Sequence, residues 1–165
     1  MGYYKELNNI TFNIVTQILQ NETICKLLYY NDEDPLAQPS FDTNILLFDR
    51  VNPSFKKPDP EINKSALINV YLYNTIPPNF GKGHRQELFY IDVICHVDSQ
   101  LIKDGLRQYF IMEEIDKMFN NVRMDGVSDQ KIVDKGALVI RPSEWHVGYS
   151  MKYEMSNDAN VCQNR

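Results

Sequence analysis

The chain has 165 residues, of which 43% are hydrophobic and 24% are charged, so it is long enough for one domain with its own core and too apolar for a disordered chain. Its formal net charge of −5 gives no basic excess to neutralise phosphate groups, which argues against sequence-independent binding of DNA or RNA. Cys25, Cys95 and Cys162 lie far apart, and none has metal-site spacing to another Cys or to a His. Because neither a signal peptide nor a membrane span is recognisable, we expect a protein of the cytoplasm.

Two helices are predicted at the start of the chain. Apolar residues recur at helical spacing from Leu7 to Ile18, which indicates an amphipathic helix over residues 3–20. Asn21 is expected to end this helix and to cap a second one over residues 22–30, because Asn is a favoured N-cap residue. The turn-rich sequence that follows stops the second helix.

A pair of strands is predicted in the middle of the chain. Residues 45–48 form a brief apolar run that is typical of a short strand, and residues 52–64 contain three prolines and three lysines, which disfavours regular structure. Apolar residues then alternate with polar ones over 66–73 and again over 88–97. These two strands predict an antiparallel pair joined by a long hairpin loop at 76–87.

The last third of the chain predicts a helix followed by two strands. Apolar residues at helical spacing place a helix over residues 100–120, loosened at Gly105. Residues 137–140 form a short strand that Pro142 breaks, and 145–154 alternate cleanly as the last strand. The polar tail from about residue 156 is expected to fray.

The order helix, helix, strand pair, helix, strand pair predicts an α+β fold. Helices, including the N-terminal helical segment, should pack on one face of an antiparallel sheet, and residues 1–165 should form a single domain.

Polar residues on the second strand raise the question of a catalytic site. Asp92, His96 and Asp98 are residue types that bind metals or transfer protons, and a small metal-dependent nuclease would use such a set. An alternating strand, however, places its polar residues on one face whatever its function, so a solvated face explains them equally. We interpret them as that solvated face and expect no catalytic residues, metal or cofactor.

Two further sets of residues receive the same structural interpretation. The carboxylates of Glu113, Glu114 and Asp116 lie beside Lys117, as on the solvated side of a helix. The segment 81–85 has two glycines and basic residues, but it leads into a strand rather than into a helix N-terminus, which is unlike a phosphate-binding loop. It is interpreted as a hairpin tip.

Aromatic residues are abundant. Trp145, Tyr149 and Tyr153 share one face of the last strand, where such a stripe is typical of a core or a subunit interface. With ten tyrosines and eight phenylalanines in the chain, this composition favours an oligomer.

Four sequence blocks resemble the tail terminator (tail-completion) and neck proteins of tailed bacteriophages over about residues 3–155. The blocks are Asn21-x-x-Ile24-x-Lys26-Leu27-Leu28-x-Tyr30, Lys64-Ser65-Ala66-Leu67-Ile68-Asn69-Val70, Leu88-Phe89-Tyr90-Ile91-Asp92-Val93-Ile94-Cys95-His96 and Gly148-Tyr149-Ser150-Met151-Lys152-Tyr153. The resemblance implies a non-enzymatic structural virion protein, assembled in the host cytoplasm, that closes into a ring, usually a hexamer, with no membrane partner. Its implied partners are other copies of itself, the tail tube protein and the head–tail connector or stopper protein, and DNA passes through the lumen without specific binding.

A ring needs contacts between different patches of each subunit. The candidates for these contacts, or for docking on the tube and connector, are the basic residues of segments 50–64 and 76–87: Arg50, Lys56, Lys57, Lys64, Lys82, His84 and Arg85. Three alternatives stay open: a head-completion or stopper neck protein, a small metal-dependent nuclease that uses Asp92, His96 and Asp98, and an adaptor domain that binds peptides at a sheet edge.

Overall fold

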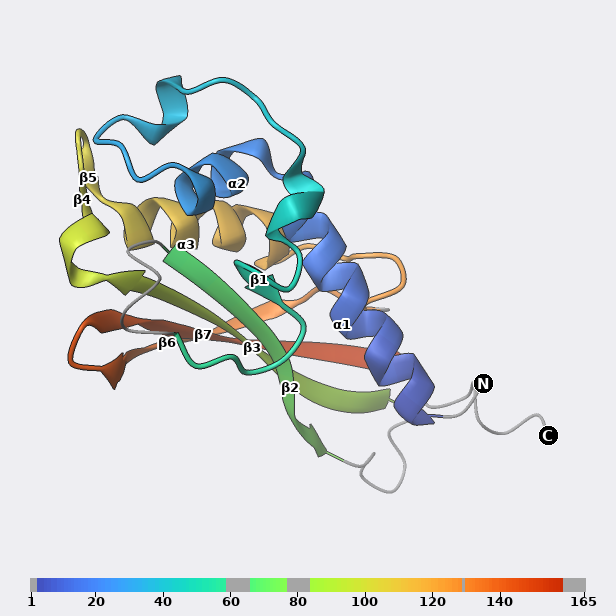
Figure 1. Cartoon of the computed structure of the whole chain (residues 1–165). Coiled ribbons are helices and arrows are strands. Elements are labelled where there is room, and N and C mark those ends of the chain that lie inside the picture. Colours follow the sequence, from blue (N-terminus) through green and yellow to red (C-terminus); the bar gives the residue numbers. More distant parts are fainter. Residues whose placement is uncertain (1–2, 59–65, 77–83, 129, 159–165) are drawn as a thin grey trace.

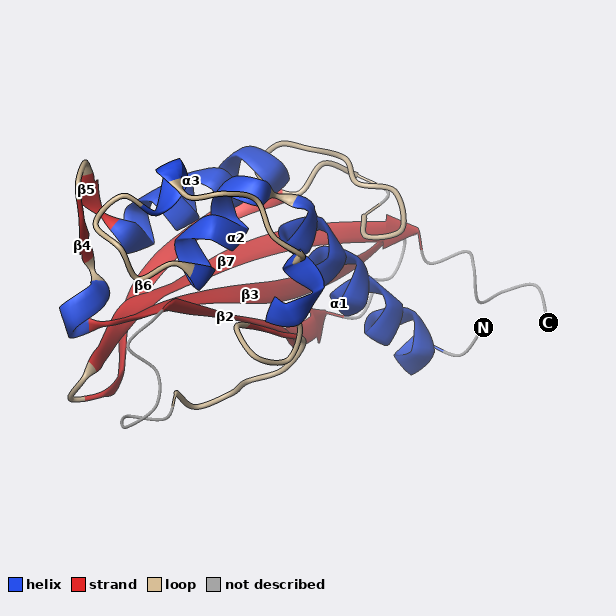
Figure 2. Cartoon of the chain, turned by 45° about the horizontal axis from the view of Figure 1, so that its top comes forward, coloured by secondary structure: helices blue, strands red, loops and turns tan. Residues whose placement is uncertain are grey.

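A layer of helices covers one face of a five-stranded sheet in the computed structural model, which describes residues 3–58, 66–76, 84–128 and 130–158 (Figure 1). Figure 2 shows the helices together on one side of the strands. The elements follow in the order α1 (Tyr3–Gln20), α2 (Glu22–Tyr29), η1 (Pro35–Ala37), η2 (Thr43–Leu46), β1 (Val51–Asn52), β2 (Ala66–Ile76), β3 (His84–His96), η3 (Val97–Ser99), β4 (Leu101–Ile102), β5 (Gly105–Leu106), α3 (Arg107–Phe119), β6 (Val133–Ser143) and β7 (His146–Asp158).

The two N-terminal helices form as predicted. The side chains of Ile10, Ile14 and Ile18 are buried on one stripe of α1, as its apolar spacing requires. Asn21 has an extended backbone, and its side-chain oxygen accepts a hydrogen bond of 3.1 Å from the backbone N–H of Ile24. This bond satisfies one of the N–H groups that the first turn of a helix leaves without a partner.

The sheet has the strand order β1-β2-β3-β7-β6. β2 pairs antiparallel with β3, β3 with β7, and β7 with β6, which confirms the α+β class and the two antiparallel pairs. β1 runs parallel to β2, with Val51 opposite Ile68, so the sheet is mixed rather than purely antiparallel. A strand of two residues has no alternation to reveal it, which is why the sequence did not predict β1.

Two local predictions were wrong. Residues 45–48 do not form a strand, because Asp42 caps the 3-10 helix η2 through the backbone N–H of Asn44 and a turn follows. The helix predicted over 100–120 begins only at Arg107. A small β4–β5 hairpin precedes it, and Gly105 has a φ of +147°, which a residue with a side chain rarely adopts.

The core lies between the helices and the apolar face of the sheet. Along β3, Phe89, Ile91, Val93 and Cys95 are fully buried on this face. The Phe89 ring stacks on Tyr153 of β7 with ring centroids 5.2 Å apart. Burial raises the pKa of the Cys95 thiol to about 12, so this cysteine is a small apolar core residue rather than a reactive thiol.

Arg107, the first residue of α3, is the largest fully buried side chain among the described residues. Its guanidinium donates hydrogen bonds to the backbone oxygens of Leu27, Tyr30, Asp32 and Ser99. The carbonyls at the end of α2 carry the negative end of the helix dipole and have no partners within the helix. The buried cation therefore joins α2 to α3, a role that nothing in the sequence pattern indicated.

The last two strands are longer than predicted. β6 includes Pro142, which an edge strand tolerates because one side of it has no strand partner. β7 extends to Asp158, so residues 156–158 belong to the sheet and not to the expected tail. The rest of that tail lies outside the described residues.

Candidate interaction surfaces

The residues of the possible metal site do not converge. On β3, Asp92 and His96 are four residues apart, a separation of about 13 Å along a strand. The backbone N–H of Asp98 donates to Nδ1 of His96 over 3.2 Å, so this ring nitrogen is used inside the turn after β3. Among the described residues, no three His, Cys, Asp or Glu side chains lie close enough together to hold a metal ion.

The interpretation of Asp92 and His96 as solvent-exposed was wrong. Their exposed fractions are 2% and 4%, because β3 is the central strand and side chains of both neighbouring strands cover it. The carboxylate of Asp92 accepts a hydrogen bond of 3.2 Å from the hydroxyl of Tyr71 and lies opposite Ser150. Burial raises the pKa of the Asp92 carboxyl, while the hydrogen bonds from Ser150 and Tyr71 lower it. The group is therefore part of a polar network that crosses β2, β3 and β7.

The carboxylates of α3 have the structural role that the sequence indicated. Lys117 forms ion pairs with Glu113 and Glu114 at 2.8 and 2.9 Å. Hydrogen bonds from Lys117 hold the pKa of the Glu114 carboxyl below its ordinary value, and Asn21 donates a further bond to it. These charges are satisfied within the subunit.

Only some of the basic residues that we expect at subunit contacts lie in the described part of the chain. Lys64 and Lys82 lie outside the described residues, and His84 and Arg85 are placed as the first residues of β3. Arg50 pairs with Asp49 at 3.2 Å, and Lys57 is exposed. The prediction of a hairpin tip over 81–85 was therefore wrong for residues 84 and 85, which belong to the central strand of the sheet, and residues 81–83 lie outside the described residues.

Lys56 has a structural role in the turn that precedes β1. Its ammonium group donates hydrogen bonds of 2.8 and 3.3 Å to the backbone oxygens of Phe48 and Asp49. The cation therefore stabilises this turn from within the subunit.

The aromatic residues of the last strand are divided between two environments. Tyr153 is buried in the core, as expected, whereas Trp145 lies in the β6–β7 turn and is 48% exposed. The Trp145 ring stacks parallel to His96, with centroids 6.4 Å apart. The Tyr149 and Tyr109 hydroxyls are 2.7 Å apart, within hydrogen-bonding distance.

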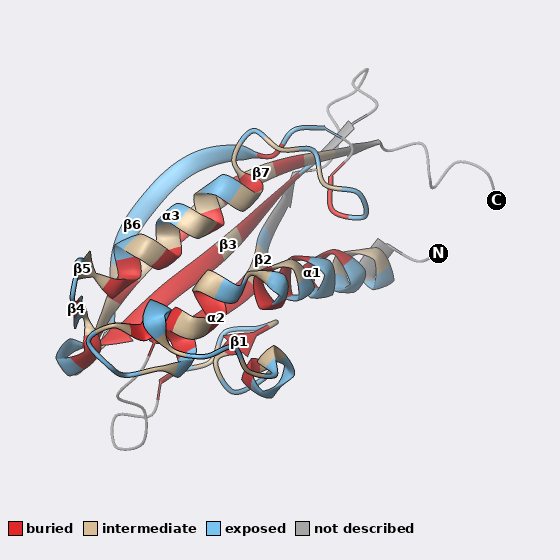
Figure 3. Ribbon diagram, turned by 90° about the horizontal axis from the view of Figure 1, so that it is seen from above, coloured by how far each residue is buried: buried red, intermediate tan, exposed pale blue. Residues whose placement is uncertain are grey.

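An apolar stretch lies exposed at one edge of the sheet. We call residues 137–140 of β6, Ala-Leu-Val-Ile, the β6 edge patch; Leu138 and Val139 in it are 72% and 67% exposed. These two residues point to opposite faces of the sheet, so the strand is uncovered on both sides. Figure 3 shows β6 in the exposed colour along the margin of the domain. Register shifts lie on both sides of the patch, but residues 137–140 themselves pair regularly with β7.

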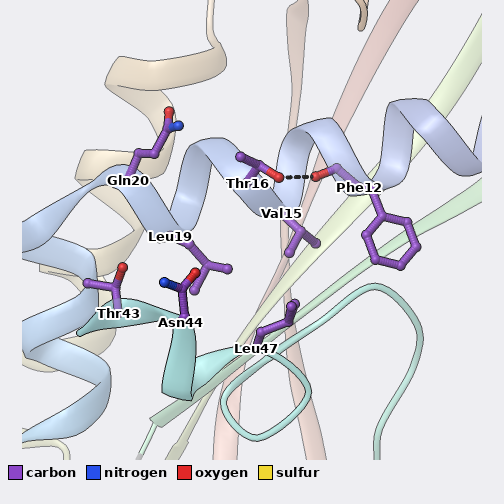
Figure 4. Close-up of a pocket in the computed structure, with 8 residues that line it drawn as sticks. All are labelled: Phe12, Val15, Thr16, Leu19, Gln20, Thr43, Asn44 and Leu47. Carbon is purple, nitrogen blue, oxygen red and sulfur yellow. Dashed lines mark hydrogen bonds between the residues drawn. The ribbon is translucent and has the colours of Figure 1, made fainter.

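A groove lies on the other side of the domain, between α1 and η2 (Figure 4). Val15 and Leu19 of α1 and Leu47 after η2 line it with apolar side chains, and the Thr16 hydroxyl donates to the backbone oxygen of Phe12. Phe12, Thr16, Gln20, Thr43 and Asn44 complete the lining, so the groove is partly polar. Phe12 and Phe48 meet edge to face with centroids 6.4 Å apart.

Phe48 has a strained backbone. Its φ is +63°, a value that costs a residue with a side chain of order 1 kcal/mol. The turn imposes this conformation: the N–H of Phe48 donates to Val51 over 2.9 Å, and the N–H of Arg50 donates to Leu46 over 2.8 Å. The turn thus presents a phenyl ring to solvent, 56% exposed, at a backbone position that would suit glycine better.

Comparison with known proteins gives this α+β domain a class. A family model of phage-derived, SPbeta prophage-like proteins matches residues 21–155, from the cap of α2 into β7, so the chain is a phage-associated protein. The family is YomW, and the chain belongs to it. No curated protein matches the chain. None of the helices in the described part of the chain is both long and apolar enough to cross a membrane.

Proposed function

We propose that the chain is a structural, non-enzymatic virion protein that forms a ring as the tail terminator, capping the tail tube and joining it to the head connector. The observation that carries this proposal is the match to a phage-associated family over residues 21–155, which includes α2, α3 and the described sheet except for the last three residues of β7. The family match supports a phage-associated protein. The more specific role of tail terminator rests in addition on the resemblance of the four sequence blocks to tail terminators.

The polar residues support a structural role. The buried Asp92 network, the ion pairs of α3 and the hydrogen bonds of Lys56 each have partners inside the subunit. A catalytic site would instead bring an acid, a base or a nucleophile together at one accessible point. Asp92, the carboxylates of α3 and Lys56 instead bind partners within the fold.

The acidic charge suits a ring through which DNA passes. With a net charge of −5, the subunit repels a polyanion at long range, so DNA slides through a lumen rather than adhering to it. The partners in this proposal are further copies of the chain, the tail tube protein and the connector or stopper protein. A hexamer is the stoichiometry that the resemblance implies.

The mass of the particle in solution tests the proposal. Light scattering on the purified chain should give a multiple of the 19.3 kDa subunit mass, and projection images should show a ring with a central hole. Purified tail tubes that have no terminator should acquire this ring at one end. A monodisperse monomer that leaves tube ends bare would contradict the proposal.

The basic contact candidates need a separate test. Reversing the charge of Lys57, Lys82 and Arg85 should impair ring formation or tube capping, and Lys57 is exposed, so its reversal should leave the subunit folded. Reversing Lys56 should have an additional effect on the turn that its ammonium group stabilises. Normal assembly of the triple variant would remove these cations from the interface.

A further inference from the structure

We propose that a single buried water molecule binds between Asn52 of β1 and Asn69 of β2 and joins the edge strand β1 to the sheet through these two side chains. The site lies inside one subunit, on the face of the sheet opposite the helices. Its test therefore does not depend on the formation of a ring.

Asn52 and Asn69 lie opposite each other across the parallel pair of β1 and β2. They are paired in the register, directly after the pair of Val51 and Ile68. Val51 and Ile68 belong to the core under the helices, and side chains alternate along a strand, so the two asparagines project from the other face. Neighbouring strands are about 4.8 Å apart, which places the two amide groups within reach of one bridging molecule.

Both asparagines are buried although they project away from the helices. Asn52 is 4% exposed and Asn69 is 0% exposed. The segment 53–58, which follows β1, covers this part of the sheet. Nδ2 of Asn69 donates a hydrogen bond of 3.0 Å to the backbone oxygen of Lys56, and the Phe55 ring meets the Tyr71 ring edge to face. The two amides are thereby removed from bulk solvent.

Each asparagine has one buried polar atom without a hydrogen-bond partner in the described part of the chain. These atoms are Nδ2 of Asn52, which is a donor, and Oδ1 of Asn69, which is an acceptor. The orientation of the Asn69 amide is fixed, because turning it over would set its oxygen against the oxygen of Lys56. One molecule that accepts from Asn52 and donates to Asn69 satisfies both atoms.

Water is the ligand that fits this pair of atoms. It accepts and donates hydrogen bonds at once, and a buried water typically makes about three of them to polar groups that otherwise have no partner. A cation would be repelled by the N–H groups of Asn52, and an apolar group would satisfy neither amide. Asp92 lies opposite Asn69 on β3, so its carboxyl is the next acceptor along the same row.

The bridge adds to a pairing that has few backbone contacts. β1 has two residues, and its register with β2 consists of the pairs at Val51 and Asn52. A water bonded to both asparagines joins the two strands beyond these pairs. It also holds the start of the segment 53–58, which contains Lys57, one of the basic residues expected at subunit contacts.

A high-resolution crystal structure of the wild type tests the site directly. It should show one water within about 3.2 Å of both Nδ2 of Asn52 and Oδ1 of Asn69. A direct hydrogen bond between the two amides, with no water between them, would overturn the proposal. So would a metal ion at this place, which contacts of about 2.0–2.6 Å to oxygen atoms would reveal.

The variant Asn52→Leu provides a second test in solution. Leucine is close to asparagine in size and shape but has no polar atom. If water bridges the two amides, this change should lower the urea midpoint of unfolding, because the bridge is lost and Oδ1 of Asn69 no longer has a donor. An unchanged or raised midpoint would show that the Asn52 amide has no buried partner, and it would contradict the site.

Combining two substitutions measures the coupling between the asparagines. Asn69→Leu alone removes both the bridge and the hydrogen bond to Lys56, so it should lower the urea midpoint further than Asn52→Leu does. Adding Asn52→Leu to Asn69→Leu should then have little effect, because the bridge is already broken. Equal effects of Asn52→Leu in the two backgrounds would mean that nothing bridges the two residues.

Asn31→Leu is the matched control for the chemical change. Its side chain is exposed, so the same substitution there should leave the urea midpoint close to that of the wild type. The crystal structure of the wild type requires no variant, so it decides for or against the water even if Asn69→Leu does not fold.

Discussion

Gly148 in β7 packs closely against the backbone of β3. A Cβ atom at this position would lie 1.9 Å from the backbone oxygen of Val93 and 2.8 Å from the Cα atom of Ile94. Both are backbone atoms of the paired strand β3, so neither can rotate away as the end of a side chain would. Gly136 differs, since its φ is +93° but nothing lies within 4 Å of its missing Cβ.

These two glycines give a matched prediction for stability. Gly148→Ala should cost about 3 kcal/mol or more of unfolding free energy, because the strands must separate to admit the methyl group. Gly136→Ala should cost only about 1 kcal/mol, from the unfavourable backbone conformation. Urea denaturation measures both, and equal costs for the two variants would show that β3 and β7 do not pack this closely.

Asp92 gives a prediction for pH dependence. Burial raises the pKa of its carboxyl above the ordinary 3.8, so the folded state holds this proton more tightly than the unfolded chain does. The stability that protonated Asp92 contributes is complete below the unfolded pKa and is lost as the pH rises through the folded pKa. Asp92→Asn should therefore gain stability relative to the wild type between pH 3 and pH 7, with the Tyr71 hydrogen bond retained.

The measurement is the urea midpoint across this pH range. Asp98→Asn is the control, because the Asp98 side chain is 66% exposed and its substitution should change the stability by less than about 0.5 kcal/mol. A constant difference between Asp92→Asn and the wild type at every pH would mean that the carboxyl is not buried in this way.

At the scale of elements, the two ends of α2 are held by different parts of the chain. Asn21 caps its start and donates to Glu114 of α3, and Arg107 satisfies carbonyl groups at its end. With only eight residues, α2 is too short to be stable as an isolated helix. Its stability therefore depends on these caps and on the burial of its apolar face.

Removing the first cap tests this dependence. Asn21→Ala should cost about 1 kcal/mol of unfolding free energy, because the backbone N–H of Ile24 loses its acceptor. Asn31→Ala, at an exposed position shortly after the end of the same helix, should change the stability by less than about 0.5 kcal/mol. Thermal unfolding followed by circular dichroism compares the two, and equal midpoints would contradict the capping role.

At the scale of the whole molecule, the acidic charge belongs to the proposed ring. In that proposal, the net charge of −5 keeps DNA from adhering to the lumen.

Binding to duplex DNA tests the role of the charge. Fluorescence anisotropy with a labelled duplex of about 30 base pairs should give a Kd weaker than about 10⁻⁴ M at physiological salt. A variant in which exposed acids are changed to lysine, and whose net charge is thereby positive, should bind the same duplex; suitable positions are Glu33, Asp104, Glu113 and Glu144. Micromolar binding by the wild type would argue against a lumen through which DNA slides.

How far the sequence predicted the structure depended on local periodicity. The helix over 3–20, the cap at Asn21 and the strand pairs around residues 66–97 and 137–154 were predicted because each repeats a pattern over several turns or alternations. β1 was missed and residues 45–48 were misassigned, because segments of two to four residues contain no complete period. The start of α3 was wrong since the β4–β5 hairpin interrupts an otherwise helical spacing.

The sequence alone did not predict which of the candidate residues are buried and which are exposed. By itself it determined the fold class, the two helices at the start and the acidic charge, which are properties of composition and of neighbours along the chain. Only the tertiary structure decided that Asp92 and His96 are buried, that Arg107 joins two helices, and that β1 and β6 are the two edge strands of the sheet. The physical reason is that burial and exposure depend on which strand is central and which is an edge, and contacts between residues distant in sequence set that order.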